Sequence, residues 1–337
     1  MAEAQPLLEV RNLKKHFQLT KGFLRRVVGT VKAVDDVSFT LQSGETLGLV
    51  GESGCGKTTV AKSVLRAIQP TSGEILFQDN GHTVDIAKLE KVELKRVRRN
   101  IQLVFQDPYS SLNPRQRVRD IIGEPLLVND VAHGKALEAR VSQLMEAVGL
   151  RPEYMIRYPH AFSGGQRQRI GIARAIALNP KLVVCDEPVS ALDVSIQAQI
   201  LNLLNDLQDE LKLTYLFISH DLGVVQHVCD RVAVMYLGRV VEIAPTKALF
   251  KRPRHPYTEA LLSASPKPHP RYRGKSRILI GEVPDQSFTT SGCYFYPRCS
   301  YRREICVTDS PALQPMDEQN NHLAACHFAK EIILEGI

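Results

Sequence analysis

A glycine-rich loop between a strand and a helix limits the folds open to this chain. Residues 51–58 read Gly-Glu-Ser-Gly-Cys-Gly-Lys-Thr and fit the pattern G-x-x-x-x-G-K-S/T. They follow the apolar run 46–50, which predicts a buried strand. In such a loop the backbone N–H groups point at a phosphate, and the dipole of the following helix adds positive potential. The pattern therefore predicts an α/β fold of the P-loop type.

The side chains of this loop have separable expected roles. Lys57 is expected to reach the β- and γ-phosphates, and the Thr58 hydroxyl to bind Mg²⁺. Cys55 is expected to be an incidental small residue, because phosphoryl transfer to water needs no thiol. The alternative is a turn without a ligand, which the four fixed positions of the pattern disfavour. The predicted nucleotide contacts in the loop are Gly51, Ser53, Gly54, Cys55, Gly56, Lys57, Thr58 and Thr59.

Two adjacent carboxylates follow a second apolar run, residues 181–185. Ligand-binding side chains of parallel α/β sheets gather at the carboxyl ends of the strands. Asp186 is therefore predicted to hold Mg²⁺, and Glu187 to act as the general base that polarises the attacking water. The alternative is a solvated strand end without catalytic function.

The order of the remaining motifs, from about Leu8 to Arg252, resembles the nucleotide-binding subunits of ATP-binding-cassette (ABC) proteins. Residues 103–106 resemble the family's Q-loop, 163–166 match its signature sequence, and 190–193 resemble its D-loop. Residues 218–221 resemble the switch-histidine segment, and 13–17 the segment whose aromatic residue stacks on adenine. The site residues that the resemblance adds are Phe17, Gln106, Ser163, Gly164, Gly165, Gln166, Asp193 and His220.

The resemblance implies how these residues act on ATP and Mg²⁺. Gln106 would touch Mg²⁺ and sense a transmembrane partner, His220 would contact the γ-phosphate, and Phe17 would stack on adenine where many relatives have tyrosine. The catalytic residues are then Glu187, His220 and Lys57. In this family ATP lies between the phosphate loop of one subunit and the signature of another, in a head-to-tail dimer.

The signature residues also have a physical interpretation of their own. Ser163, Gly164 and Gly165 precede a helical run over residues 166–178, so their hydroxyl and N–H groups can form an anion site at a helix start. The alternative is an ordinary N-cap at Ser163. Both interpretations can hold together, since they use the same geometry.

The chain of 337 residues is long enough for a main domain and an appended region. We expect an ABC nucleotide-binding domain over residues 6–250, with antiparallel strands in 6–48 and a helical subdomain over about 108–178. A small Cys-rich C-terminal region is expected over 251–337. The basic loop at 21–32 has no assigned function.

The charge and hydropathy of the chain bear on its location. No apolar run approaches the ~18 residues that span a bilayer, and the N-terminus lacks a signal-peptide core. The sequence therefore predicts a soluble protein of the cytosol. The net charge of +7 would favour binding to anionic lipid or to nucleic acid, and charge alone does not distinguish between these two partners. The resemblance places the protein at the cytoplasmic face of the inner membrane, as a peripheral subunit.

Residues 255–258, His-Pro-Tyr-Thr, and those that follow resemble the C-terminal region of the oligopeptide/dipeptide subgroup of ABC importers. The resemblance implies an ATP hydrolase that powers peptide uptake. Its partners would be a second cassette subunit, favoured to be a paralogue, two transmembrane permease subunits and an extracytoplasmic solute-binding protein. The alternatives are import of nickel or oligosaccharides, a soluble ABC ATPase acting on nucleic acid or ribosomes, and a non-catalytic cassette. No nucleic acid is expected as a partner.

Four of the seven cysteines, Cys293, Cys299, Cys306 and Cys326, have the spacing C-x5-C-x6-C-x19-C. In a cytosolic chain such clustering favours a metal centre over disulfides. Four thiolates can hold Zn²⁺ or an iron–sulfur cluster, and zinc sites usually show closer pairs. The resemblance also implies a 4Fe–4S cluster, with zinc or free buried cysteines as the alternatives. His322 and His327 are expected at the surface or behind the ligands.

Overall fold

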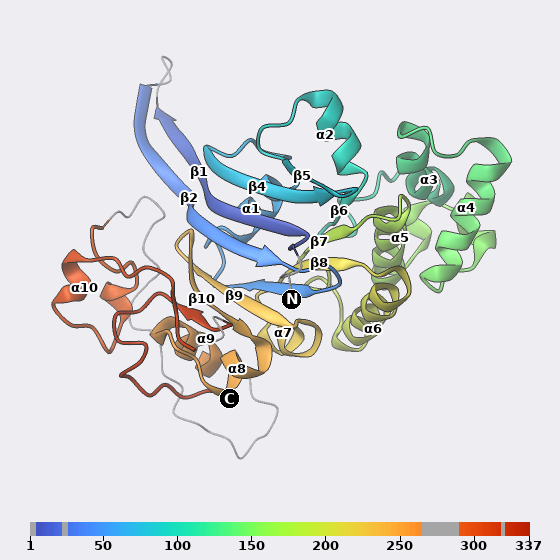
Figure 1. The fold of residues 1–337 in the computed structure, drawn as a ribbon. Helices are drawn as coiled ribbons and strands as arrows, with labels where there is room; N and C mark the ends of the chain where they lie inside the picture. The colour runs from blue at the N-terminus through green and yellow to red at the C-terminus, as the bar shows by residue number, and fades with distance from the viewer. Residues whose placement is uncertain (1–4, 22–25, 265–289, 318–320) are drawn as a thin grey trace. The chain divides into compact units, whose positions relative to one another are not determined.

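The computed structural model describes residues 5–21, 26–264, 290–317 and 321–337. The chain divides into two compact units. The first, here called the helical unit, comprises Met1–Leu7, Leu41–Glu45 and Gln78–Ile218. The second, here called the P-loop unit, comprises Leu8–Thr40, Thr46–Phe77 and Ser219–Ile337. Figure 1 labels the α-helices and most of the strands of both units.

The P-loop unit is built largely from strands. Two long strands pair side by side, and β4 pairs antiparallel with β1, with Leu8 opposite Phe77 (Figure 1). A second group has the order β11-β12-β10-β9-β3, in which β3 is parallel to β9. The strands are β1 (Leu8–Lys21), β2 (Arg26–Leu41), β3 (Thr46–Val50), β4 (Ser72–Asp79), β9 (Arg231–Tyr236), β10 (Arg239–Pro245), β11 (Gln314–Pro315) and β12 (Leu323–Ala324).

Short helices complete the P-loop unit, and α1 begins directly after the glycine-rich loop. All five residues of β3 are buried, as expected for a parallel strand covered on both faces. The late hairpin β11–β12 joins the sheet through β12, where Leu323 and Ala324 pair with Ile243 and Glu242 of β10. The helices are α1 (Lys57–Val64), α7 (Leu222–Val228), α8 (Thr246–Lys251), α9 (Pro256–Ala264), α10 (Ile305–Thr308) and the 3-10 turn Tyr296–Arg298.

The helical unit combines a small parallel sheet with a helical group. Its parallel strands have the order β8-β7-β6, and β7 and β8 are buried along their whole length. Helices α3, α4 and α5 pack on one another. The elements are β5 (His82–Asp85), β6 (Ile101–Val104), β7 (Leu182–Asp186), β8 (Thr214–Ile218), α2 (Lys91–Arg98), α3 (Val118–Val128), α4 (Gly134–Ala147), α5 (Gly164–Ile176), α6 (Val194–Leu211) and the 3-10 turns Pro152–Ile156 and Pro159–Ala161.

The sequence predicted the P-loop fold and its mixed sheets correctly. Helices α3, α4 and α5 lie inside the range 108–178, and the strands around the glycine loop and the paired carboxylates are present. One detail differs: residues 46–48 belong to β3, which is parallel to β9 and not antiparallel. Part of the basic loop at 21–32 lies outside the described residues. Among the described residues, none of the helices has the length and hydropathy needed to cross a membrane.

Candidate functional site

The predicted site residues fall in both units, and each group is described within its own unit. In the P-loop unit, the loop between β3 and α1 turns through glycines with positive φ. Gly51 has φ 150° and Gly56 has φ 110°. A Cβ at Gly51 would lie 2.2 Å from the carbonyl oxygen of Met235, and one at Gly56 would lie 2.1 Å from that of Ala33. These two positions therefore require glycine for both conformation and space.

Lys57 begins helix α1 and lies buried beneath the loop. Its ammonium donates to the carbonyl oxygens of Gly51 at 2.8 Å and Glu52 at 3.0 Å. These bonds fix the charge at the inner side of the loop, where it can face a phosphate group. Burial raises the pKa of the adjacent Cys55 thiol, so the thiol stays protonated and is a poor nucleophile.

Glu52, the second residue of the loop, is held at each of its polar groups. Its N–H donates to the hydroxyl of Tyr257 at 2.9 Å, and its carbonyl accepts the bond from Lys57. Its carboxylate accepts two bonds from Arg298, with Nη1 at 2.7 Å and Nη2 at 3.0 Å from the two oxygens. The Arg298 side chain is only 5% exposed. The loop is thus anchored by two residues from beyond position 250.

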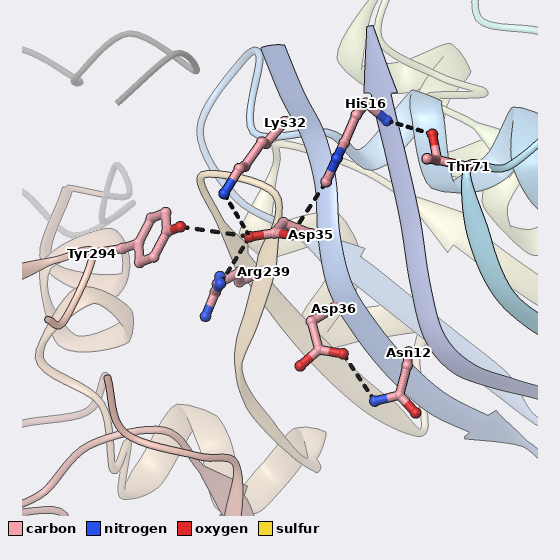
Figure 2. Close-up of polar contacts among 8 residues, drawn as sticks. All are labelled: Asn12, His16, Lys32, Asp35, Asp36, Thr71, Arg239 and Tyr294. Atoms are coloured by element: carbon pink, nitrogen blue, oxygen red, sulfur yellow. Dashed lines mark hydrogen bonds and ion pairs between the residues drawn. The ribbon is translucent and has the colours of Figure 1, made fainter. Parts of the chain in front are cut away.

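A second polar cluster surrounds the buried carboxylate of Asp35 in β2. Arg239 donates to it at 2.8 Å, and the Tyr294 hydroxyl at 3.5 Å. Burial alone would raise the pKa of Asp35, but hydrogen bonding and charge hold that pKa below its ordinary value. Figure 2 shows the side chains that converge on this carboxylate: His16, Lys32, Arg239 and Tyr294.

The Asp35 cluster fixes the strand that carries the predicted adenine contact. His16 Nε2 lies 3.2 Å from Asp35, and the backbone N–H of His16 donates to Thr71 Oγ1 at 2.9 Å (Figure 2). The next residue, Phe17, keeps an exposed ring, and the Lys15 ammonium lies 4.9 Å from its centre. The ring is thus available for stacking on a flat ligand.

His220 also belongs to the P-loop unit and is exposed. It lies between Ser219, whose N–H donates to the carbonyl of Leu49 in β3, and Asp221, which caps helix α7. Asp221 accepts bonds from the N–H groups of Gly223 and Val224. His220 is therefore carried by a loop that is fixed on both sides.

In the helical unit, β7 ends at the buried Asp186, and Glu187 follows with a positive φ of 48°. This left-handed conformation is unusual for a residue with a side chain, and such strain concentrates at functional sites. The N–H of Glu187 donates to the carbonyl of Ile218 at 3.0 Å, which ties the turn to the end of β8. Gln106 Nε2 donates to Glu187 Oε2 at 2.8 Å, so the structure brings together two residues predicted from separate motifs.

The signature residues start helix α5 with a capping box. Gln166 N–H donates to Ser163 Oγ at 3.4 Å, and Ser163 N–H donates to Gln166 Oε1 at 3.0 Å. The N-cap interpretation of Ser163 is thus confirmed. The helix starts with Gly164 and Gly165, which have no side chains to hinder an anion from approaching the N–H groups of the first turn.

The D-loop segment lies against the signature within the helical unit. Asp193 is the N-cap residue of α6 and accepts the N–H of Gln197 through its carbonyl. A Cβ at Gly165 would lie 2.5 Å from Cγ2 of Ile196, in the first turn of α6. The close approach of these two segments therefore depends on glycine at position 165.

The predicted metal centre is not confirmed. Within the described ranges, no group of His, Cys, Asp or Glu side chains is placed to hold a metal ion. The four late cysteines are free thiols that line one small cavity together with His255 and Phe295. Burial raises the pKa of Cys299 to about 12 and that of Cys326 to about 11. His322 is buried rather than at the surface, and its Nε2 lies 2.7 Å from the fully buried carboxylate of Glu242.

The sequence analysis missed several residues of the P-loop unit. Glu52 occupies a free position of the loop pattern, and the partners Tyr257 and Arg298 lie far along the chain. The His-Pro-Tyr-Thr motif was the available signal for one of them. In this motif the Tyr257 hydroxyl reaches the loop, and Nδ1 of His255 accepts the N–H of Tyr257 at 3.0 Å. Burial lowers the pKa of His255 to about 3, so it stays neutral.

Two family models match the chain. Residues 34–190 match the ABC transporter model, and residues 241–306 match the model of the oligopeptide/dipeptide transporter C-terminal region. The second match contains Tyr257 and Arg298, which contact Glu52. It also contains His255, whose ring accepts the N–H of Tyr257.

Similar proteins include transport ATP-binding proteins of several bacteria. The oligopeptide transport ATP-binding protein AppF of Bacillus subtilis is 50% identical over 97% of this chain and 98% of its own length. The di/tripeptide transport ATP-binding protein DppF of Pseudomonas aeruginosa is 45% identical over 98% of this chain and 99% of its own length.

Solved structures of ABC proteins are similar to this chain in fold. The ATP-binding cassette MJ0796, in a dimeric post-hydrolysis state with ADP and phosphate, has a TM-score of 0.61 and 26% identity over 71% of this chain and 98% of its own. The cbiO1 protein from Clostridium perfringens has a TM-score of 0.61 and 27% identity over 73% of this chain and 91% of its own.

Proposed function

The chain belongs to the ATP-binding subunits of oligopeptide/dipeptide ABC transporters, and from that premise we propose that it hydrolyses ATP to drive import of short peptides. The observation that carries the proposal is the similarity to named peptide transport subunits over nearly the whole chain, including the C-terminal region. Residues 6–250 would form the cassette and residues 251–337 its appended region.

The proposed reaction uses the residues described in each unit. The loop and Lys57 would bind the β- and γ-phosphates, with Thr58, Asp186 and Gln106 around Mg²⁺. Glu187 would polarise the attacking water, and His220 would contact the γ-phosphate. Phe17 would stack on adenine. The capped helix start at Ser163 would bind the ATP held by a partner cassette, together with the D-loop residue Asp193.

The subunit would work in a larger assembly. A second cassette, favoured to be a paralogue, would complete both ATP sites, and the dimeric relative with ADP and phosphate supports this arrangement. Closure of the pair on ATP would be transmitted through the Gln106 region to two permease subunits, and hydrolysis would reset it. The peptide would arrive on an extracytoplasmic solute-binding protein, and the chain would sit at the cytoplasmic membrane face.

The decisive experiment is purification of the tagged chain from a detergent extract of its own cells. We expect permease subunits, a second cassette and a peptide-binding receptor to copurify, and labelled di- or oligopeptide uptake to stop when the chain carries Glu187→Gln. Copurification of a receptor for nickel or oligosaccharide, with normal peptide uptake, would refute the peptide assignment and leave the ATPase assignment in place.

We also propose that the four late cysteines bind a 4Fe–4S cluster, with zinc as the alternative. The support is that all four line the same small cavity. Such a cluster would supply a structural or regulatory element, since ATP hydrolysis needs no redox step. Anaerobically purified protein should be brown and contain iron and acid-labile sulfide. Colourless protein with stoichiometric zinc would rule out the cluster.

A further inference from the structure

The phosphate loop contains a carboxylate, and the C-terminal region supplies its counter-charge. A carboxylate at Glu52 stands in a loop predicted to bind phosphate groups, which carry the same sign of charge. Arg298 covers it with a two-point contact at 2.7 and 3.0 Å, and the arginine side chain is 5% exposed. The hydrogen bonds that Arg298 donates to Glu52 raise the pKa of the guanidinium, which keeps its positive charge opposite the carboxylate.

Glu52 is also held through its backbone N–H. Tyr257 is fully buried, and its hydroxyl accepts the N–H of Glu52 at 2.9 Å. Its ring packs on Tyr236 and Phe295, with ring centres 4.6 and 5.5 Å away. The hydroxyl is therefore held in place by packing. It fixes the direction of the Gly51–Glu52 peptide, whose carbonyl oxygen accepts a hydrogen bond from Lys57 at 2.8 Å.

We propose that Arg298 and Tyr257 are positioning residues through which the C-terminal region sets the affinity of the phosphate loop for nucleotide. Arg298 neutralises the Glu52 carboxylate, and Tyr257 orients the Gly51–Glu52 peptide, so that the carbonyl of Gly51 holds the Lys57 ammonium in place. This inference rests on nucleotide binding by the loop, as proposed above. The C-terminal region then acts on the ATP site itself, in addition to any role in partner binding.

The test compares three variants of the full-length chain by titration with the fluorescent ATP analogue mant-ATP and Mg²⁺. Arg298→Gln leaves the carboxylate uncompensated and should weaken binding roughly tenfold. The double variant Glu52→Gln/Arg298→Gln removes the repelling charge as well and should bind within about threefold of the parent. Arg303→Gln breaks an exposed ion pair with Glu331 in the same region and should bind like the parent.

ATPase kinetics separate positioning from folding. A positioning role raises the KM for ATP in Arg298→Gln, whereas partial unfolding lowers kcat at unchanged KM. Equal affinity of Arg298→Gln and the parent, or a double variant as weak as the single one, would overturn the proposal.

A milder variant covers the case in which Arg298→Gln does not fold. Tyr257→Phe keeps the ring and removes only the acceptor of the Glu52 N–H, and it should weaken mant-ATP binding about threefold. Unchanged binding by this variant would likewise contradict the proposal.

If the parent itself fails to bind mant-ATP, the proposed function fails. If the parent binds and Lys57→Ala does not, while Arg298→Gln and Tyr257→Phe bind normally, only this inference fails.

Discussion

The two units hold their site residues in different ways. In the P-loop unit, Lys57 is buried and bonded to two loop carbonyls, and Glu52 is fixed through its N–H, carbonyl and carboxylate. In the helical unit, Glu187 is half-buried and pairs with the exposed Gln106. Phosphate binding gains from rigid, preorganised groups, whereas a general base must be reached by the water that it activates. The contrast suits a division of labour between binding and turnover.

The largest effect that tests this contrast is expected at Glu187. Glu187→Gln removes the proposed general base, so ATP turnover should fall by about 100- to 10,000-fold. Nucleotide affinity should hardly change, because the proposed phosphate contacts are made by other residues, chiefly those of the loop at 51–58. Phosphate release by the assembled transporter, together with mant-ATP titration, measures both quantities. Glu210→Gln, an exposed change on α6, serves as the control. Near-parental turnover by Glu187→Gln would show that the base is another group.

Lys57→Ala should have the opposite effect to Glu187→Gln, because it should weaken nucleotide binding itself. Loss of the ammonium removes the charge-assisted contact proposed between Lys57 and phosphate, and nucleotide affinity should fall about 10- to 100-fold. Equilibrium titration measures this directly. Lys62→Ala, on the exposed side of the same helix, should bind normally. An affinity loss as large in Lys62→Ala would mean that general charge, not the loop geometry, attracts the nucleotide.

Asp35→Asn tests whether the Asp35 cluster stiffens the P-loop unit. Removing one charge of a buried network should cost about 2 kcal/mol of the free energy of unfolding at neutral pH. The folded pKa of Asp35 is lowered, so its contribution is complete above the unfolded pKa of about 4 and disappears as the pH falls through the folded value.

The difference between the parent and Asp35→Asn should therefore shrink below about pH 4. Urea unfolding at neutral and acid pH measures it. If the free energies of unfolding of the parent and Asp35→Asn differ by the same amount at neutral and acid pH, the charge of Asp35 contributes nothing to stability.

The smallest effect is expected at the start of α5. Ser163→Ala removes the capping oxygen and should cost about 1 kcal/mol of stability, whereas Ser163→Thr keeps the oxygen and should cost less. Both variants should keep the mant-ATP affinity of a single chain, because this helix start is proposed to serve the ATP of the partner cassette. Thermal unfolding and titration together test this. Weaker binding by an isolated Ser163→Ala chain would contradict the shared site.

Local patterns in the sequence predicted the parts of the site that are built from neighbouring residues. The loop at 51–58, the strand end at Asp186 and Glu187, and the cap at Ser163 each depend on residues within a few positions. Periodicity and cap chemistry report such geometry directly. The family resemblance added Gln106 and His220, which no local rule would have selected.

The sequence analysis could not identify the long-range partners of Glu52, because local patterns relate only residues a few positions apart. Glu52 meets Tyr257 and Arg298 across 205 and 246 positions, and no spacing rule links such residues. Likewise, the cysteine spacing indicated a shared site and could not give its geometry. The four thiols do share a cavity, yet a metal-binding arrangement is not confirmed among the described residues.

The β11–β12 hairpin has a consequence for how the protein may be shortened. Its strand β12 pairs with β10 and occupies hydrogen-bonding positions along that strand. A chain cut before the hairpin would leave those N–H and C=O groups of β10 open to strands of other molecules. Truncated versions made to isolate the cassette should therefore tend to self-associate, even though all the residues proposed to bind phosphate are intact.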